Sequence, residues 1–138
     1  MKGHLTIPSP VSEISTNWIS EHNSNILLKR DDLIHPIISG NKWRKLSGIL
    51  AKNRSSDYDS LITFGGAYSN HLLAVAAVCS ILKIRCKAFV RGEAPKTLNA
   101  VLKMCKMYGM ELAFISRENY QKSNRKSGVF DRTLFIPE

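Results

Sequence analysis

The fold is decided by residues 60–78, which read SLITFGGAYSNHLLAVAAV. Residues 60–64 are mostly apolar or β-branched, which is typical of a buried strand, and we expect the strand to stop at Gly65-Gly66. The run that begins at Leu72 would be apolar on nearly every side of a helix, so we expect a helix that is covered all round. A strand joined to such a helix by a short turn is the repeating unit of a parallel sheet.

The alternation of strands and helices continues on both sides of this unit. It predicts strands at 26–30, 86–90, 111–115 and 133–136, helices at 41–53 and 97–108, and a helix or loop at 117–127. We therefore expect an α/β fold, a three-layer open parallel sheet with helices on both faces. In such a sheet ligands bind beyond the carboxyl ends of the strands, where residues 65–71 would lie.

The first 25 residues have a different composition. They contain Pro8, Pro10 and several serines and asparagines, which predicts an irregular arm with one short helical piece at 11–19. We accordingly divide the chain into residues 1–40, an arm with one strand, and residues 41–138, the parallel α/β domain.

Length and composition are those of one small globular domain, with 138 residues of which 43% are hydrophobic. The 20 basic and 11 acidic residues give a net charge of +9, which raises nucleic acid as a partner. The basic residues are scattered, however, and no aromatic residues lie among them to stack on bases. We interpret them as solvated helix faces and expect no nucleic-acid partner.

The cysteines and the N-terminus bear on where the protein works. Cys79, Cys86 and Cys105 are an odd number without C-x-x-C spacing and lie in apolar surroundings, so we expect reduced, structural thiols and neither a disulfide nor a zinc site. The N-terminus lacks the apolar core of a signal peptide, and no apolar run is long enough to span a membrane. The expected location is the cytoplasm, without a membrane partner.

Two adjacent acids, Asp31 and Asp32, follow the strand expected at 26–30. Paired carboxylates can bind a metal ion or act as acid and base. No third ligand lies at a suitable spacing, so we expect these acids to pair with Lys29, Arg30 or the helix N-terminus that follows. No metal site is expected.

A second polar turn, residues 39–46 (SGNKWRKL), brings a lysine into the first turn of an expected helix. A helix N-terminus carries partial positive charge, and Arg44 and Lys45 add more, so the neutral amine of Lys42 is favoured over the ammonium. A neutral amine is a nucleophile that forms Schiff bases with carbonyls, above all with the aldehyde of pyridoxal phosphate. The alternative is that these three side chains form the solvated face of an amphipathic helix, since most lysines are surface residues.

Residues 65–71 form the other candidate site. The two glycines let the backbone approach a ligand closely, and Ser69 and Asn70 place short polar side chains and free backbone N–H groups at a helix start, which suits an anion. The alternative is that Ser69 or Asn70 caps the helix, that Gly-Gly is a turn, and that His71 makes a local hydrogen bond. The pattern matches neither the dinucleotide-binding fingerprint nor the P-loop.

Three stretches taken together are more specific than either turn alone. Residues 29–33 (KRDDL), 39–46 and 63–71 (TFGGAYSNH) resemble, in order and spacing, the pyridoxal-phosphate family of 1-aminocyclopropane-1-carboxylate deaminase and D-cysteine desulfhydrase. The resemblance runs from about residue 26 to Glu138. It implies the smaller domain of the tryptophan-synthase-beta-like fold, called fold type II.

The resemblance also implies a role for each matching residue. Lys42 would form the Schiff base with the cofactor and then shuttle a proton, while Asn70 would bond the cofactor's ring hydroxyl and Asn41 would also face the cofactor. Ser69 would hold the substrate carboxylate and take part in proton transfer. Asn70 and His71 would complete the substrate side of the site.

Members of this family are considerably longer than this chain, and a second, larger domain carries their glycine-rich loop for the cofactor phosphate. We therefore expect this chain to bind pyridoxal phosphate weakly and to be inactive alone. Residues 1–40 would pack on that larger domain. The apolar surface exposed without it favours self-association, so a homo-oligomer is expected.

Three functional hypotheses follow. The first is a pyridoxal-phosphate-dependent deaminase that acts on 1-aminocyclopropane-1-carboxylate or a related small amino acid. The second is a D-cysteine desulfhydrase of the same family. The third is a non-catalytic α/β module whose basic surface binds an acidic partner.

Overall fold

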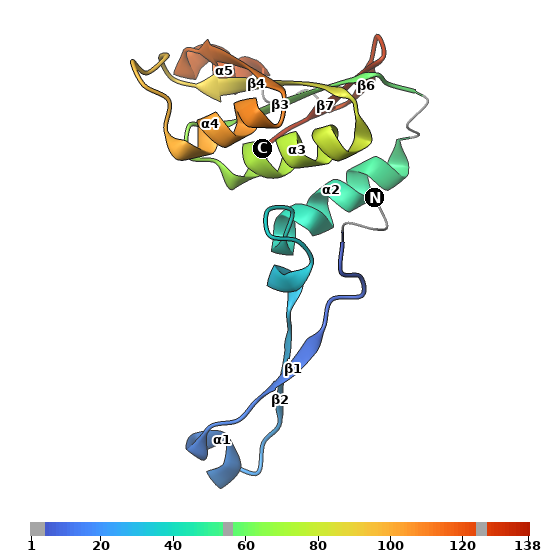
Figure 1. The fold of residues 1–138 in the computed structure, drawn as a ribbon, viewed down its shortest axis with the longest axis vertical. Helices are drawn as coiled ribbons and strands as arrows, with labels where there is room; N and C mark the ends of the chain where they lie inside the picture. Colours follow the sequence, from blue (N-terminus) through green and yellow to red (C-terminus); the bar gives the residue numbers. More distant parts are fainter. Residues whose placement is uncertain (1–4, 54–56, 124–126) are drawn as a thin grey trace.

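The computed structural model describes residues 5–53, 57–123 and 127–138, and Figure 1 shows their arrangement. A five-stranded sheet in the order β5-β4-β3-β7-β6 forms the centre of the domain. Its strands are β3 (Ser60–Gly66), β4 (Arg85–Arg91), β5 (Met110–Ile115), β6 (Gly128–Phe130) and β7 (Thr133–Ile136). β3 pairs in parallel with β4 and β7, and β4 pairs in parallel with β5. The strands predicted from residue 60 onward are confirmed, and so is the parallel α/β architecture.

The edge strand β6 was not predicted, and it makes the sheet mixed rather than wholly parallel. It pairs antiparallel with β7 through a hairpin turn at Asp131 and Arg132, whose φ angles are +46° and +53°. Two successive positive φ angles define a type I′ turn, which usually carries asparagine or glycine. Arg132 in the second position gives no such signal, so the hairpin could not be recognised from the sequence.

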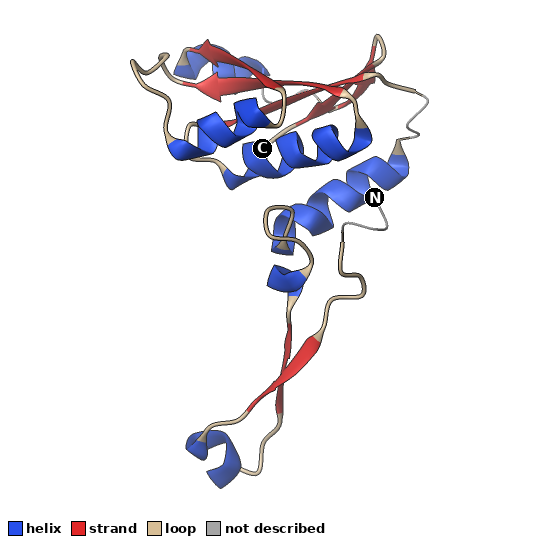
Figure 2. Cartoon of the chain, in the orientation of Figure 1, coloured by secondary structure: helices blue, strands red, loops and turns tan. Residues whose placement is uncertain are grey.

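Helices cover the two faces of the sheet unequally, as Figures 1 and 2 show. On one side α3 (Asn70–Leu82) and α4 (Ala100–Met107) lie on the strands, and α2 (Gly40–Lys52) packs against α3. On the other side lies α5 (Arg117–Ser123), whose Tyr120 makes an edge contact with Phe64 at 6.1 Å between ring centroids. The part predicted as a helix or loop is thus helical to Ser123, and residues 124–126 lie outside the described residues.

The main core lies between the sheet and α3. α3 is enclosed by the sheet, α2 and α4, so the prediction of a helix covered all round is confirmed. Besides His71, seven of its side chains are buried: Leu72, Ala74, Val75, Ala76, Ala77, Val78 and Cys79. The three cysteines are free and buried, as expected. Burial raises the pKa of the Cys105 thiol to about 11, which keeps it protonated and unreactive at neutral pH.

The N-terminal residues form an arm that projects from the domain (Figure 1). It consists of β1 (Val11–Ile14) and β2 (Ile26–Lys29), paired antiparallel, with α1 (Asn17–Glu21) at the tip. The predicted helical piece at 11–19 is wrong for its first half, because Val11–Ile14 pairs antiparallel with β2, a partner that local sequence does not reveal. The strand predicted at 26–30 is present, but it joins this ribbon and not the larger sheet.

Candidate active site

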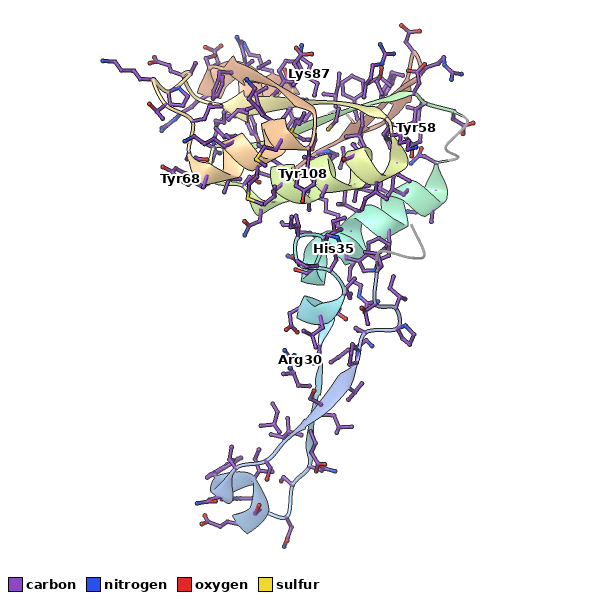
Figure 3. The ribbon with its side chains drawn as sticks, viewed as in Figure 1. Arg30, His35, Tyr58, Tyr68, Lys87 and Tyr108 are labelled. Carbon is purple, nitrogen blue, oxygen red and sulfur yellow. The ribbon has the colours of Figure 1, made fainter. Side chains whose placement is uncertain are left out.

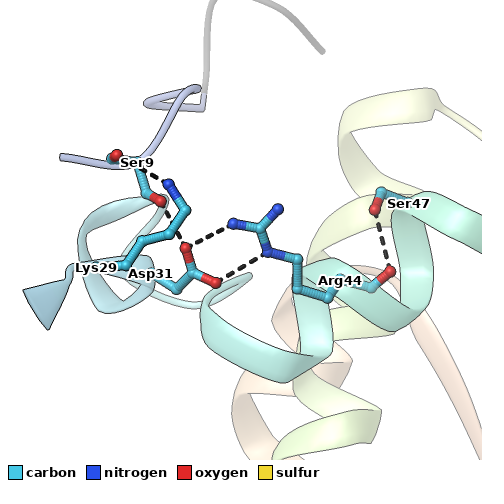
Figure 4. Close-up of polar contacts among 5 residues, drawn as sticks. All are labelled: Ser9, Lys29, Asp31, Arg44 and Ser47. Atoms are coloured by element: carbon cyan, nitrogen blue, oxygen red, sulfur yellow. Dashed lines mark hydrogen bonds and ion pairs between the residues drawn. The ribbon is translucent and has the colours of Figure 1, made fainter. Parts of the chain in front are cut away.

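The arm is tied to α2 by a charged cluster, which Figure 4 shows in close-up. Arg44 donates two hydrogen bonds to the carboxylate of Asp31, at 2.9 and 2.7 Å, and the Ser9 hydroxyl donates a third at 2.5 Å. Lys29 Nζ adds a hydrogen bond to the Ser9 carbonyl at 3.4 Å. The hydrogen bonds from Arg44 and Ser9 lower the pKa of Asp31 well below its usual range, so its carboxylate is ionised at neutral pH. This cluster fixes the start of α2 against the base of the arm.

The two adjacent acids therefore serve as ion-pair partners. Asp32 pairs with Arg30 at 2.7 Å, as expected, whereas the partner of Asp31 is Arg44, which the sequence did not indicate. No group of three or more side chains suited to a metal ion is found in the described part of the chain. Within the same residues no helix is long and apolar enough to cross a membrane.

Lys42 lies in the first turn of α2. The helix starts at Gly40, whose φ of +55° is a left-handed conformation that glycine adopts without strain, and the Lys42 N–H donates to the Ser39 carbonyl at 3.2 Å. Asn41, Lys42 and Asn70 line one cavity of about 430 Å³, which is completed by Pro36, Ile37, Ser39, Gly40, Leu73 and Met104. The structure thus brings the predicted lysine and the predicted asparagine, 28 positions apart, to one concave site.

A second cavity of about 430 Å³ opens beside Ser69. It is lined by Gly66, Ala67, Tyr68, Ser69, Arg91, Gly92, Arg117 and Glu138. Ser69 caps α3, because its hydroxyl accepts from the His71 N–H at 3.2 Å, and its own N–H donates to the Gly66 carbonyl at 3.0 Å. Ser69 and Asn70 are adjacent in the chain, so the two cavities flank the N-terminus of α3. Tyr68 is 80% exposed at this loop (Figure 3).

The loop before α3 is held from two sides. Asn99 Nδ2 donates to the Ala67 carbonyl at 2.8 Å, while the Asn99 side-chain oxygen caps α4 by accepting from the Leu102 N–H at 2.9 Å. On the other side Gly65 packs so closely on α3 that an added Cβ would lie 2.7 Å from Leu72 Cγ. The loop is therefore positioned by both α3 and α4.

The His71 side chain lies in the interior of the domain. Its side chain is buried, and its Nε2 lies 2.9 Å from the Thr63 hydroxyl, which donates its only proton to the Ile136 carbonyl at 2.9 Å. The Thr63 oxygen must then accept from His71 Nε2–H, which leaves Nδ1 without a proton, and Nδ1 has no hydrogen-bond partner among the described residues. His71 lines neither of the two cavities, and its described contribution to them is the backbone N–H that Ser69 accepts.

The neutral state of His71 gives a pH prediction. Burial, followed by the charges of Lys45 and Lys42, lowers its pKa to about 4, against 6.5 for the free side chain, while Glu138 acts in the opposite sense. Below pH 6.5 the His71 side chain binds a proton in the unfolded chain, whereas in the folded chain it stays neutral down to about pH 4. Stability should therefore fall over this interval by up to about 3 kcal/mol at 1.36 kcal/mol per pKa unit.

Urea denaturation between pH 7 and pH 4 would measure this slope. His71→Gln should flatten it, whereas His22→Gln at the exposed tip of the arm should leave it unchanged. If stability depended equally on pH in the wild type and in His71→Gln, the lowered pKa of His71 would be contradicted.

Four residues at or beside the Ser69 cavity were not predicted from the sequence: Arg91, Arg117, Tyr120 and Glu138. The Tyr120 hydroxyl donates to Glu138 Oε2 at 2.6 Å, and the Arg91 guanidinium lies 5.3 Å from the centre of the Tyr120 ring. These residues come from α5, the segment after β7 and the end of β4, so no local motif links them. The one available signal was the position of Arg91 at the carboxyl end of a predicted strand, where ligands of parallel sheets collect.

Comparison with known proteins agrees with this geometry. Residues 7–130 match the family described as "Pyridoxal-phosphate dependent enzyme". The chain belongs to this family.

Similar proteins in the pyridoxal-phosphate-dependent family include deaminases and desulfhydrases. A putative 1-aminocyclopropane-1-carboxylate deaminase of Thermotoga maritima is 34% identical over 124 residues, which cover 90% of this chain and 38% of that protein. A putative mitochondrial D-cysteine desulfhydrase 2 of Oryza sativa subsp. japonica is 36% identical over 91 residues, covering 66% of this chain and 22% of that protein. A crystal structure of a 1-aminocyclopropane-1-carboxylate deaminase homologue superposes with a TM-score of 0.67 at 25% identity, over 97% of this chain and 43% of that chain. The chain thus spans less than half the length of each of these relatives.

The described residues fit one end of the pyridoxal-phosphate group. The cavity at the start of α2 offers a primary amine from Lys42, for the aldehyde, and an amide from Asn70 that can donate a hydrogen bond to the ring hydroxyl. The N-terminus of α3 adds partial positive charge, which suits an anionic ligand. Lys42 would hold the aldehyde carbon and Asn70 the ring.

Proposed function

We propose that this chain supplies the lysine side of the active site of a pyridoxal-phosphate-dependent deaminase acting on 1-aminocyclopropane-1-carboxylate or a related small amino acid. The observation that carries the proposal is the shared cavity of Lys42 and Asn70 beside the Ser69 loop. D-cysteine desulfhydration is the second candidate, because relatives of similar identity carry each name.

The proposed roles are those that the family resemblance implies, and the cavity positions of Lys42, Asn41 and Asn70 support them. When bound, pyridoxal phosphate acts as an electron sink that stabilises a carbanion on the amino-acid carbon. The Lys42 amine, in the first turn of α2, then holds or moves a proton at its Nζ. Asn70 orients the cofactor ring, and Asn41, which lines the same cavity, limits the space beside it.

The Ser69 loop would hold the substrate carboxylate. Ser69 Oγ accepts from the His71 N–H, and its hydroxyl proton is donated to the Glu138 carboxylate, whose place a substrate carboxylate would take. The Gly66–Ser69 turn and the first N–H groups of α3 add donors without a side-chain entropy cost. These donors support a substrate carboxylate bound at the N-terminus of α3.

We further propose that residues 1–40 form an arm that packs on a larger domain like that of the longer relatives, and residues 41–138 the smaller domain. The arm exposes apolar side chains that a folded protein normally covers, among them Trp18 at 61% and Leu27 at 65%. Without such a domain we expect weak cofactor binding, little activity, and association of two or more copies through the arm.

The proposal is tested by the absorbance spectrum of the chain saturated with pyridoxal phosphate. Adding 1-aminocyclopropane-1-carboxylate should change the spectrum saturably, because the amino acid competes with Lys42 for the cofactor carbonyl, and Asn70→Ala should weaken the response. A response to D-cysteine at lower concentration would favour the desulfhydrase instead. No response to either amino acid, with cofactor still retained, would contradict the proposal.

A further inference from the structure

Two arginines from different elements line the Ser69 cavity. Arg91 ends β4 and Arg117 begins α5, and both line the cavity of about 430 Å³ that contains Ser69. Together with Gln121 they also line an adjoining cavity of about 380 Å³. The two hollows therefore share one positively charged wall.

These two guanidinium groups differ from the other arginines that the structure describes. Arg30 and Arg44 pair with Asp32 and Asp31, and Arg85 and Arg132 both pair with Asp59. For Arg91 and Arg117 no ion pair is found among the described residues, although both lie beside a concave surface. Besides the electrostatic effect of Arg91 on Glu138, no described acid neutralises these two charges.

Arg91 is also held in place. Its guanidinium lies 5.3 Å from the centre of the Tyr120 ring, and the Tyr120 side chain is itself buried against Phe64. The neighbouring Gly92 N–H donates to the Ile115 carbonyl at 2.9 Å, which fixes the end of β4 on β5. A donor that is already positioned loses less conformational entropy when it binds an anion.

The same cavity already accommodates one carboxylate, that of Glu138. Burial raises the pKa of Glu138, but hydrogen bonds from the Tyr120 and Ser69 side chains and the Gly66 backbone, with the charge of Arg91, lower it overall. Hydrogen-bond donors at this position therefore stabilise an ionised carboxylate. One carboxylate faces two guanidinium groups, so the described lining keeps a net positive charge.

Glu93 and Glu118 are the nearest acids in sequence to Arg91 and Arg117. Glu118 pairs with Lys122 at 2.7 Å, and neither acid lines the cavity. The positive wall is therefore not neutralised by the acids next to it in the chain.

We propose that Arg91 and Arg117 bind a second carboxylate, so that among the small amino acids related to 1-aminocyclopropane-1-carboxylate the site prefers a dicarboxylic one. The assignment rests on the proposed function for the first carboxylate, which the Ser69 loop would hold. Guanidinium groups suit a carboxylate because they donate in a planar fork. A cavity of about 430 Å³ has room for a molecule of four or five carbons.

The test compares succinate with butyrate, two four-carbon acids that differ in the second carboxylate. Their binding to the ¹⁵N-labelled chain is followed by amide chemical shifts at constant ionic strength, without cofactor. We expect succinate to bind on the order of tenfold more tightly, with shifts at residues 66–69, 91–92 and 117, because only succinate carries the second carboxylate. A tenfold difference corresponds to about 1.4 kcal/mol. Arg117→Gln, at an exposed position, should remove the preference.

Arg91→Gln should act in the same way, and Arg85→Gln is the matched control because Arg85 lies at the opposite end of the same strand and pairs with Asp59. Equal binding of the two acids, or a preference for succinate that survives both Arg91→Gln and Arg117→Gln, would overturn the proposal. If the chain preferred succinate but its Lys42 did not react with pyridoxal phosphate, the anion site would be supported and the proposed function contradicted. If Lys42 reacted with pyridoxal phosphate but succinate and butyrate bound equally, the proposed function would be supported and the anion site contradicted.

Discussion

Lys42→Ala should abolish the covalent attachment of pyridoxal phosphate to the chain. The amine of Lys42 is the only one we assign to the cavity shared with Asn70, and a covalent bond to the cofactor needs that amine. The hydrogen bonds that remain contribute about 1 kcal/mol each, so a few of them hold the cofactor no more tightly than the millimolar range. The measurement is the cofactor absorbance that remains with the chain after borohydride reduction and dialysis.

Lys45→Ala is the control for the loss of Lys42. Lys45 lies one turn later on α2, carries the same charge, and uses its Nζ to donate to the Pro137 carbonyl at 3.2 Å. Its removal should leave cofactor retention close to that of the wild type. Equal losses in the two variants would show that the helix binds the cofactor by charge alone.

Gly65→Ala should lower the stability of the whole domain. The added methyl group would lie 2.7 and 2.8 Å from Leu72 Cγ and Cδ2 and 3.1 Å from Ser69 Cβ. Leu72 is fully buried and cannot move aside, so β3 and α3 would have to separate. Overpacking of this kind costs about 3 kcal/mol, which corresponds to a fall of roughly 10 °C in Tm for a domain of this size.

Gly66→Ala is the matched control for Gly65→Ala. At this neighbouring position the nearest atom to an added Cβ is Arg91 Nη2 at 3.7 Å, an ordinary contact. Its effect on stability should stay within about 0.5 kcal/mol. Thermal denaturation followed by circular dichroism distinguishes the two, and similar melting temperatures for both variants would contradict the close approach of β3 and α3.

The two glycines show how far the sequence could predict the fold. The spacing of hydrophobic residues and the local composition were enough to predict most strands and helices of the domain. Each of these elements buries one face or all of its faces, and that pattern is visible in its own residues. The β1–β2 ribbon and the β6–β7 hairpin were missed because their pairing depends on a distant partner or on a turn without glycine. The sequence also could not reveal that Gly65, and not Gly66, is the position where space is lacking.

The residues of the candidate site that lie in local sequence motifs were predicted, whereas those brought together from distant segments were not. Lys42, Ser69 and Asn70 each lie at a helix start next to a recognisable turn, and the structure places them at two adjoining cavities. His71 belongs to the same motif, yet its ring turns inward to Thr63, because position 71 faces the sheet. Arg91 and Arg117 could not be assigned from the sequence, since only the parallel pairing of β4 and β5 brings the end of one near the helix that follows the other.

Mapping the lysine that reacts with pyridoxal phosphate tests most directly whether Lys42 forms the bond to the cofactor. The chain is incubated with substoichiometric cofactor, reduced with borohydride, digested, and analysed by mass spectrometry. We expect the label on Lys42, with little on Lys45 or on the lysines of α4. Label spread evenly over the lysines of the chain, with no preference for Lys42, would contradict it.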